Sequence, residues 1–196
     1  DTGFGEAMSA ARTVRLMEEA GISGCHIEDQ RMPKRCGHLD GKELVSAETM
    51  VQRIGAAAGA RMDSNFLLIA RSDARAVEGL ERAIERMKAY VDAGADMIFP
   101  EAINTLEQYR EFSAAVDVPI LANITEFGHT PLFSTPELGA AGVDIVLYCC
   151  GAYRAMNRAA ETVYRALRED GHQRNVVDIM QTREQLYAYL DYHAYE

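Results

Sequence analysis

The chain has 196 residues, 48% of them hydrophobic, which is enough for one sizeable core. Its formal net charge of -10 argues against nucleic acid or an anionic membrane as a partner, because both bind basic surfaces. No apolar run approaches the roughly 18 residues of a bilayer span, and no basic start followed by a short apolar stretch marks a secretory signal. We therefore expect a cytoplasmic protein.

Five short apolar runs recur along the chain and are typical of strands buried on both faces. They cover residues 22–28, 66–71, 96–101, 118–124 and 143–149. Segments with helical periodicity are interspersed with them, at 7–20, 47–60, 78–91, 106–116, 152–169 and 185–190. The spacing of Ser134 with Glu137, and of Thr182 with Gln185, is that of a capping box and predicts two helix starts.

This alternation predicts parallel βαβ units, either in an open doubly wound sheet or in a closed barrel. No Gly-x-Gly-x-x-Gly motif follows a strand, which disfavours a dinucleotide-binding open sheet. We therefore predict an α/β fold of the TIM-type (β/α)8 barrel class. Such a barrel takes about 250 residues. Because only five strands follow Asp1, we expect the N-terminal strands to be missing and residues 1–196 to form a single partial barrel domain with C-terminal helices.

Side chains able to bind or react stand at the C-terminal end of nearly every apolar run. They are Asp1, His26, Glu28, Asp29, Arg71, Glu101, Asn123, Thr125 and Glu126. In a β/α barrel these strand ends meet at one mouth, where active sites lie. Turn chemistry alone favours Gly, Asn or Ser at such places. A single one of these residues is as well explained as a solvated loop start, but the set together favours a site.

Asp1 and Glu28 supply hard oxygen ligands, and His26 shares a strand face with Glu28. Carboxylates that leave positions for water and substrate suit Mg²⁺. Zinc is the competing metal, since Cys36 and His38 are also candidate ligands, but their spacing is not that of a structural zinc site. We therefore predict magnesium.

The longest segment without a regular pattern, residues 29–45, contains Lys34-Arg35-Cys36-Gly37-His38. Loops of this length in compact barrels are usually lids or binding loops. Neighbouring positive charges lower the pKa of a cysteine and make its thiol a competent proton donor or acceptor near neutrality. The alternative is a basic, exposed turn with an incidental cysteine, and composition leaves the two interpretations close.

This run, with His26-Ile-Glu-Asp-Gln30 before it, resembles the signature of the isocitrate lyase and phosphoenolpyruvate mutase superfamily. Later motifs make essentially the whole chain similar to the 2-methylisocitrate lyase family within it, namely Ala122-Asn-Ile-Thr-Glu-Phe-Gly128, Tyr153-Arg-Ala-Met-Asn-Arg158 and Met180-Gln-Thr-Arg183. The resemblance implies a barrel of the phosphoenolpyruvate/pyruvate class. It also implies magnesium-dependent cleavage of a tricarboxylate, 2-methylisocitrate, to pyruvate and succinate in the methylcitrate cycle of propionate catabolism.

The resemblance implies roles for single residues as well. Cys36 is the loop acid toward the succinate enolate, and Glu28 and His26 complete the expected catalytic set. Asp1 and Glu28 serve the magnesium ion. Substrate contacts are implied for Cys36, Gly37, Arg71, Glu101, Asn123, Thr125, Arg154 and Arg183. Because the family's first strands carry a substrate loop and another magnesium aspartate, the chain alone is expected to be inactive.

Two alternatives stay open. The first is another enzyme of the superfamily, such as isocitrate lyase, oxaloacetate hydrolase or a phosphonate mutase. The second is a catalytically inert truncated fragment that acts only in assembly. The resemblance further implies a homotetramer in which C-terminal helices pack across subunits.

Overall fold

The computed structural model describes all 196 residues. It contains two compact units, Asp1–Cys149 and Cys150–Glu196. None of the helices has both the length and the apolar character that crossing a membrane requires.

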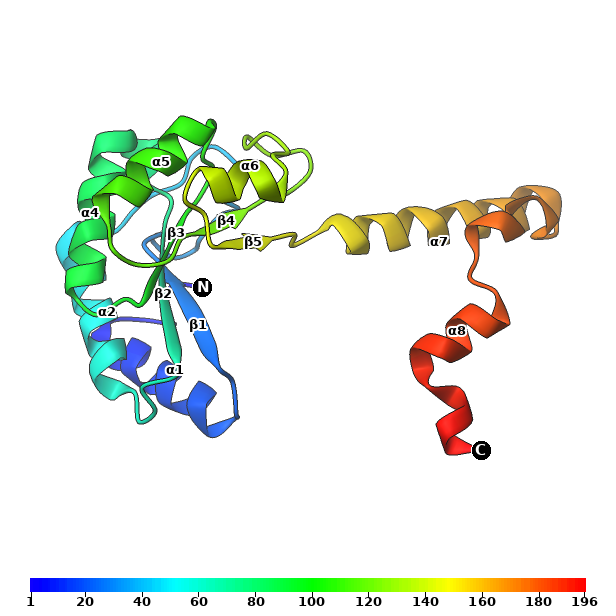
Figure 1. The fold of residues 1–196 in the computed structure, drawn as a ribbon, viewed down its shortest axis with the longest axis horizontal. Helices are drawn as coiled ribbons and strands as arrows, with labels where there is room; N and C mark the ends of the chain where they lie inside the picture. The colour runs from blue at the N-terminus through cyan, green and yellow to red at the C-terminus, as the bar shows by residue number, and fades with distance from the viewer. The chain divides into compact units, whose positions relative to one another are not determined.

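The first unit alternates helices with strands along the chain (Figure 1). Its strands are β1 (Gly24–Glu28), β2 (Leu67–Ser72), β3 (Met97–Pro100), β4 (Leu121–Asn123) and β5 (Ile145–Leu147). Its helices are α1 (Ala7–Glu19), α2 (Ala47–Ala60), α3 (Ala74–Glu78), α4 (Leu80–Asp92), α5 (Leu106–Ala115) and α6 (Thr135–Ala140). All five predicted strands are present, and only the short helix α3 lay outside the prediction.

The strands are parallel and follow one another in chain order. One sheet has the order β1-β2-β3 and a second pairs β4 with β5. A parallel bridge between Ile98 and Ile120 joins β3 to the start of β4, and the Ile98 N–H donates to the Pro119 carbonyl at 3.0 Å. An open doubly wound sheet reverses its strand order, whereas a barrel wall does not. The structure thus shows five strands of a singly wound wall. It does not show the closed barrel of eight strands that was predicted.

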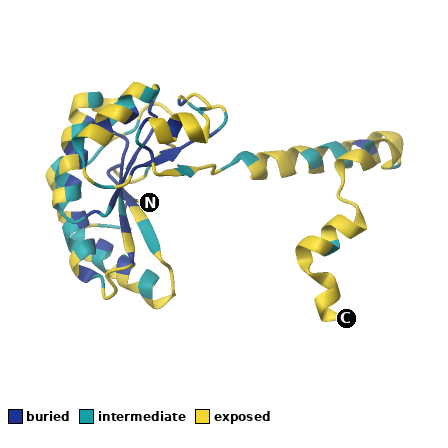
Figure 2. Ribbon diagram, in the orientation of Figure 1, coloured by how far each residue is buried: buried dark blue, intermediate teal, exposed yellow.

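The two faces of this wall are buried to different extents. Helices cover one face, where alternate strand residues such as Ile27, Leu68 and Ile98 join the main core (Figure 2). The opposite face, called the inner face below, carries a small cluster of Met97, Phe99 and Leu121 with Ile69 packed against it. At its flanks His26 of β1 and Ile145 and Leu147 of β5 are exposed. The prediction that the strands are buried on both faces is therefore wrong at the flanks, because β1 and β5 end the wall.

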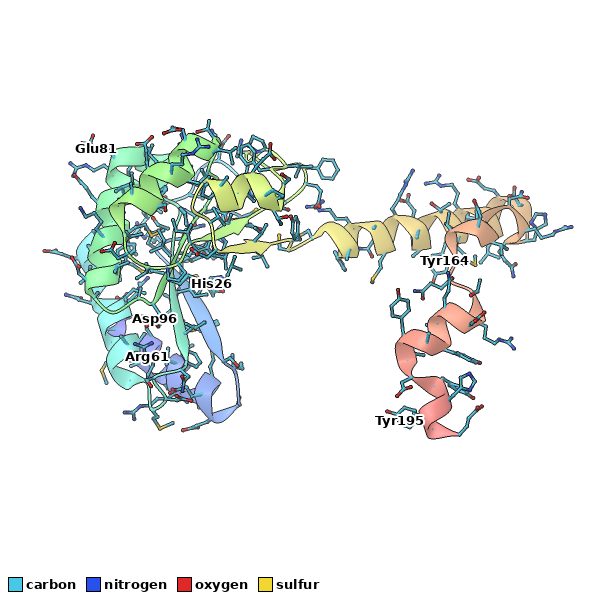
Figure 3. All side chains as sticks on the ribbon, viewed as in Figure 1. His26, Arg61, Glu81, Asp96, Tyr164 and Tyr195 are labelled. Carbon is cyan, nitrogen blue, oxygen red and sulfur yellow. The ribbon has the colours of Figure 1, made fainter.

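The starts of two strands are anchored by aspartates. Gly94 and Gly142 follow α4 and α6 with φ of 111° and 86°, a left-handed turn that favours glycine. The Asp96 carboxylate, two residues later, accepts from the Leu68 N–H at 2.8 Å and pairs with Arg61 (Figure 3). In the same way Asp144 accepts from the Ile120 N–H at 2.9 Å. These contacts fix the register of neighbouring strands, and with it the level of their C-terminal ends.

The second unit contains α7 (Gly151–Asp170), a 3-10 turn η1 (Arg174–Ile179), α8 (Arg183–Leu190) and a 3-10 turn η2 (Tyr192–Tyr195). Of its residues, Ala166 alone is buried. Within it, Tyr187 stacks on Tyr192 with ring centroids 4.2 Å apart. Capping boxes begin both α6 and α8, so the two helix starts predicted from spacing are confirmed.

Candidate active site

Arg71, at the end of β2, lies among carboxylates from three segments. Its Nε is 3.3 Å from Glu28 Oε2 and 3.2 Å from Asp73 Oδ2, and its Nη1 is 3.1 Å from Glu101 Oε2. The guanidinium also lies over the Phe99 ring, 5.0 Å from the centroid. All four charged residues are buried. The ends of β1, β2 and β3 therefore meet at one edge of the inner face, as their sequence positions predicted.

Glu101 connects this edge to β4 and to the loop. Its carboxylate accepts from Asn123 Nδ2 at 3.4 Å and from the backbone N–H of Ala102 at 3.1 Å. Buried Ala102 has a φ of 58°, a left-handed conformation that costs an alanine about 1 kcal/mol. Arg71 and His38 hold the pKa of Glu101 below its usual value although burial opposes them. Glu101 is therefore a fixed, ionised acceptor for cationic groups.

Of the remaining strand-end residues, Thr125 is buried just beyond β4, and its part in substrate binding stays a prediction. Asp1 lies beside the end of β1, since its carbonyl accepts from the Glu28 N–H at 2.9 Å. Its own carboxylate is capped by the Thr2 N–H at 2.7 Å. The two predicted metal ligands are thus neighbours along the edge.

The metal prediction has partial support from these side chains. No three or more His, Cys, Asp and Glu side chains form a metal-binding group. However, neither oxygen of the fully buried Glu28 carboxylate accepts a hydrogen bond; each has an ion-pair contact, Lys34 Nζ at 3.0 Å and Arg71 at 3.3 Å. A protein Mg²⁺ site often has only one or two carboxylates and several waters. Glu28 and Asp1 are compatible with such a site.

His26, expected in the catalytic set, stands on the inner face of β1 one pleat before Glu28 (Figure 3). Its ring meets Phe99 edge-on, with centroids 5.6 Å apart. Its side chain is exposed, yet the protein around the ring displaces water, and this is the main reason why the pKa of His26 is lowered to about 4. His26 is therefore neutral at pH 7 and has no imidazolium proton to give.

The loop 29–45 is seated on the strand ends. His38 Nε2 is 3.1 Å from Glu101 Oε1, and His38 Nδ1 accepts from the His129 N–H at 3.1 Å. Gly37 is buried so closely that a Cβ there would lie 2.3 Å from Glu101 Cγ and 2.7 Å from an Arg71 nitrogen. No residue larger than glycine fits in this space, which explains why position 37 is a glycine. The loop thus covers the Arg71 and Glu101 pair directly.

Cys36, beside this contact, is an exposed free thiol. The positive groups expected to surround it are engaged elsewhere. Lys34 pairs with Glu28, Arg35 Nη1 donates to the Asp40 carbonyl at 2.8 Å, and His38 pairs with Glu101. These basic residues therefore fix the loop through contacts with other groups, and they do not support the expectation that positive charges surround the Cys36 thiol.

Sequence reasoning missed several buried groups at this edge. Asp73, one of the carboxylates on Arg71, looks like ordinary turn chemistry before α3. Asp29 was noted only as a strand end, but its fully buried carboxylate accepts from Ser72 Oγ at 2.5 Å, the Asp73 N–H at 3.0 Å and Tyr90 Oη at 2.9 Å. Burial raises the pKa of Asp29 to about 6. It sits behind the strand ends and fixes the turn that carries Asp73.

Two predicted substrate contacts lie in the other unit. Arg154 is in the first turn of α7 and Arg183 begins α8. This unit is described by itself, so the contact of both residues with substrate stays a prediction.

The profile of a known family, described as "Phosphoenolpyruvate phosphomutase", matches residues 1–168. The chain belongs to this family. Its curated relatives include the 2-methylisocitrate lyase of Shewanella oneidensis, which is 59% identical over 196 residues, all of this chain and 67% of the relative. The family resemblance read from the motifs is confirmed.

Solved structures of the family agree with the fold. A 2,3-dimethylmalate lyase aligns with a TM-score of 0.87 at 36% identity, over 96% of this chain and 63% of that one. A phosphonopyruvate hydrolase complex with oxalate and Mg²⁺ aligns with a TM-score of 0.82 at 30% identity, over 99% and 68%. This chain therefore spans about two thirds of the length of its relatives.

Proposed function

We propose that the protein carrying this chain is a lyase that cleaves 2-methylisocitrate to pyruvate and succinate. The observation that carries the proposal is the seat of the Cys36–Gly37 segment on the Arg71 and Glu101 pair. In this arrangement a loop with a free thiol covers a cationic group at the end of a parallel strand. The 59% identity to a 2-methylisocitrate lyase over the whole chain supports this choice of substrate.

The reaction divides into steps that the side chains can serve. The substrate is held by its carboxylates, for which the guanidinium of Arg71 has the right planar fork. The hydroxyl proton passes to a base on β1, for which Glu28 and His26 are the candidates. As the carbon-carbon bond breaks, its electron pair moves to the succinate half, and the Cys36 thiol supplies the proton that completes succinate. The closed loop keeps water from the enolate.

Magnesium is part of the proposal, and the charges at the strand ends support it. Glu28, Asp73 and Glu101 are three carboxylates beside two permanently charged partners, Arg71 and Lys34, and His38 adds a positive charge only when protonated, so negative charge at this edge disfavours a polycarboxylate. Glu28 and Asp1 would hold a Mg²⁺ ion, which would supply Lewis-acid stabilisation of the negative charge that develops as the bond breaks. The solved relative with oxalate and Mg²⁺ is in line with this assignment.

The test is an assay of the full-length protein with 2-methylisocitrate, measuring pyruvate release. Cys36→Ser is expected to lower kcat by about a hundredfold or more, because a hydroxyl is a far weaker acid than a thiol. Isocitrate, oxaloacetate and 2,3-dimethylmalate serve as competing substrates. A higher kcat/KM for one of these acids would reassign the protein within the family. Absence of cleavage with all four acids would overturn the proposed function.

We also propose a homo-oligomer, with a tetramer as the expected state. The second unit exposes many apolar side chains, among them Tyr153, Met156, Tyr164 and Tyr195 (Figure 3). Exposed apolar surface on this scale is typical of an interface. Light scattering of the full-length protein tests the state directly. The cytoplasmic location and the place in propionate catabolism stay predictions.

A further inference from the structure

Gln30 is a buried amide at the fixed base of the loop. It directly follows Asp29, is 1% exposed, and pairs with Leu44 in an antiparallel bridge that closes the two stems of the loop. The Arg31 N–H donates to the Glu43 carbonyl at 2.7 Å and the Val45 N–H to the Asp29 carbonyl at 2.9 Å on either side of this bridge. The backbone of Gln30 is thus held between the two stems of the loop, and the Asp29 N–H ties these stems to β2 by donating to the Arg71 carbonyl at 3.2 Å.

The side chain of Gln30 grips the backbone of Arg35. Its Nε2 donates to the Arg35 carbonyl at 2.9 Å, and its Oε1 accepts from the Arg35 N–H at 2.8 Å. The two contacts also decide which end of the amide is oxygen, since only one orientation satisfies both. Both polar groups of this buried amide bond to the backbone of one residue, so the side chain serves to hold Arg35 in place.

Cys36 follows immediately, and a second set of contacts holds the chain beyond it. The Leu39 N–H donates to the Cys36 carbonyl at 3.0 Å, which makes a tight turn over residues 36–39. Lys42 Nζ donates to the carbonyls of Gly37 and Leu39, both at 2.7 Å. The thiol therefore lies between a clamped residue on one side and a tied turn on the other.

We propose that Gln30 is a positioning residue for Cys36: its amide clamps the preceding peptide and so sets where the thiol stands over the substrate. This inference rests on the proposed function for its kinetic consequence, and on the hydrogen bonds alone for its structural one. In the proposed function the substrate carboxylates are held mainly by Arg71, a strand-end group that the clamp does not touch. Loss of the clamp therefore acts on the proton-transfer step, and binding is left almost intact.

Two variants of the full-length protein test this. Gln30→Met removes both hydrogen bonds while keeping similar volume, and we expect kcat to fall about thirtyfold, the factor for two ordinary hydrogen bonds, with KM changed less than about threefold. Gln30→Glu keeps the acceptor for the Arg35 N–H. When its carboxyl is protonated it also regains the donor, so its kcat relative to wild type is expected to recover as the pH falls below neutrality.

The matched control is Glu18→Ala. Glu18 accepts from the backbone N–H groups of Met62 and Asp63 at 3.0 and 2.9 Å, in the connection that precedes β2 at the other end of the strands. Glu18→Ala removes hydrogen bonds from a side chain to backbone N–H groups away from the loop, so this variant reports general destabilisation. Amide hydrogen exchange over residues 31–42 is measured for all variants and is expected to speed up in Gln30→Met, to a smaller extent in Gln30→Glu near neutral pH, and not in Glu18→Ala.

Wild-type kcat with unchanged loop exchange in Gln30→Met would overturn the proposal. So would a fall in kcat that Glu18→Ala reproduces, or a Gln30→Glu variant without recovery at low pH. If wild-type protein cleaves none of the acids, the proposed function fails by itself, and the exchange of the loop amides still decides whether the clamp exists.

Discussion

Replacing Gly37 by alanine tests the seat of the loop on the strand ends. The added Cβ would lie 2.3 Å from Glu101 Cγ, 2.7 Å from Arg71 Nη2 and 2.8 Å from Asp73 Oδ1. All three are buried and mutually paired, so none moves away cheaply. Overpacking of this kind costs about 1–3 kcal/mol, and the closed loop bears that cost while the open loop does not. We expect kcat/KM for 2-methylisocitrate to fall about tenfold to a hundredfold.

The free energy of unfolding is expected to change much less, because an opened loop relieves the clash without disturbing the core. Gly59→Ala is the matched control: nothing lies within 4 Å of a Cβ at this helical position. It should raise stability by about 0.5–1 kcal/mol and leave kcat/KM as it is. Steady-state kinetics and urea unfolding of the three proteins measure both quantities. A Gly37→Ala enzyme with wild-type kcat/KM would show that the loop does not close on these residues during turnover.

Three further outcomes follow from the buried charges. Burial raises the pKa of Asp29 from 3.8 to about 6, so between these values the folded protein holds a proton that the unfolded chain has released; this contribution to stability is present at low pH and lost as the pH rises through about 6. The unfolding free energy of wild type minus that of Asp29→Asn should therefore fall by up to about 3 kcal/mol from pH 4 to pH 6 in urea titrations. A difference that does not change with pH would contradict the raised pKa of Asp29. Arg71→Lys leaves at least one of its three carboxylates unpaired; kcat/KM should drop about a hundredfold, and thermal unfolding should show a loss of roughly 1–3 kcal/mol. Glu28→Gln should abolish the Mg²⁺ binding that calorimetry detects in wild type, and chelation with EDTA should stop pyruvate release; binding retained in Glu28→Gln would place the ion elsewhere.

Much of the fold could be predicted because its signals are local. Apolar runs of strand length, helical stripes and capping boxes each depend on residues close in sequence, and the strands and main helices lie where these patterns place them. The meeting of Glu28, Arg71 and Glu101 was also predictable, because parallel strands bring their carboxyl ends to one edge. The exposed flanks of the inner face were not, since burial of a strand depends on neighbours that its own residues do not encode.

The candidate site was predicted only in part for the same reason. Asp73 and Gln30 are polar residues in turn-like segments, and a sequence does not say that their side chains are buried against Arg71 and Arg35. The basic loop shows the opposite error. Lys34 and His38 were interpreted as neighbours of the thiol, but each pairs with a carboxylate on another segment. A signal was available for Gln30: a glutamine at the end of a buried strand needs partners for both ends of its amide.

Glu101 has one further consequence, because a single carboxylate serves both Arg71 and His38. Whatever draws Arg71 away from Glu101 changes the charge that His38 meets, and thereby the affinity of the loop for the wall. By thermodynamic reciprocity, a seated loop must change the affinity of Arg71 for an incoming anion by the same factor. Substrate binding and loop closure are then linked by one coupling free energy, which depends on the carboxylate of Glu101.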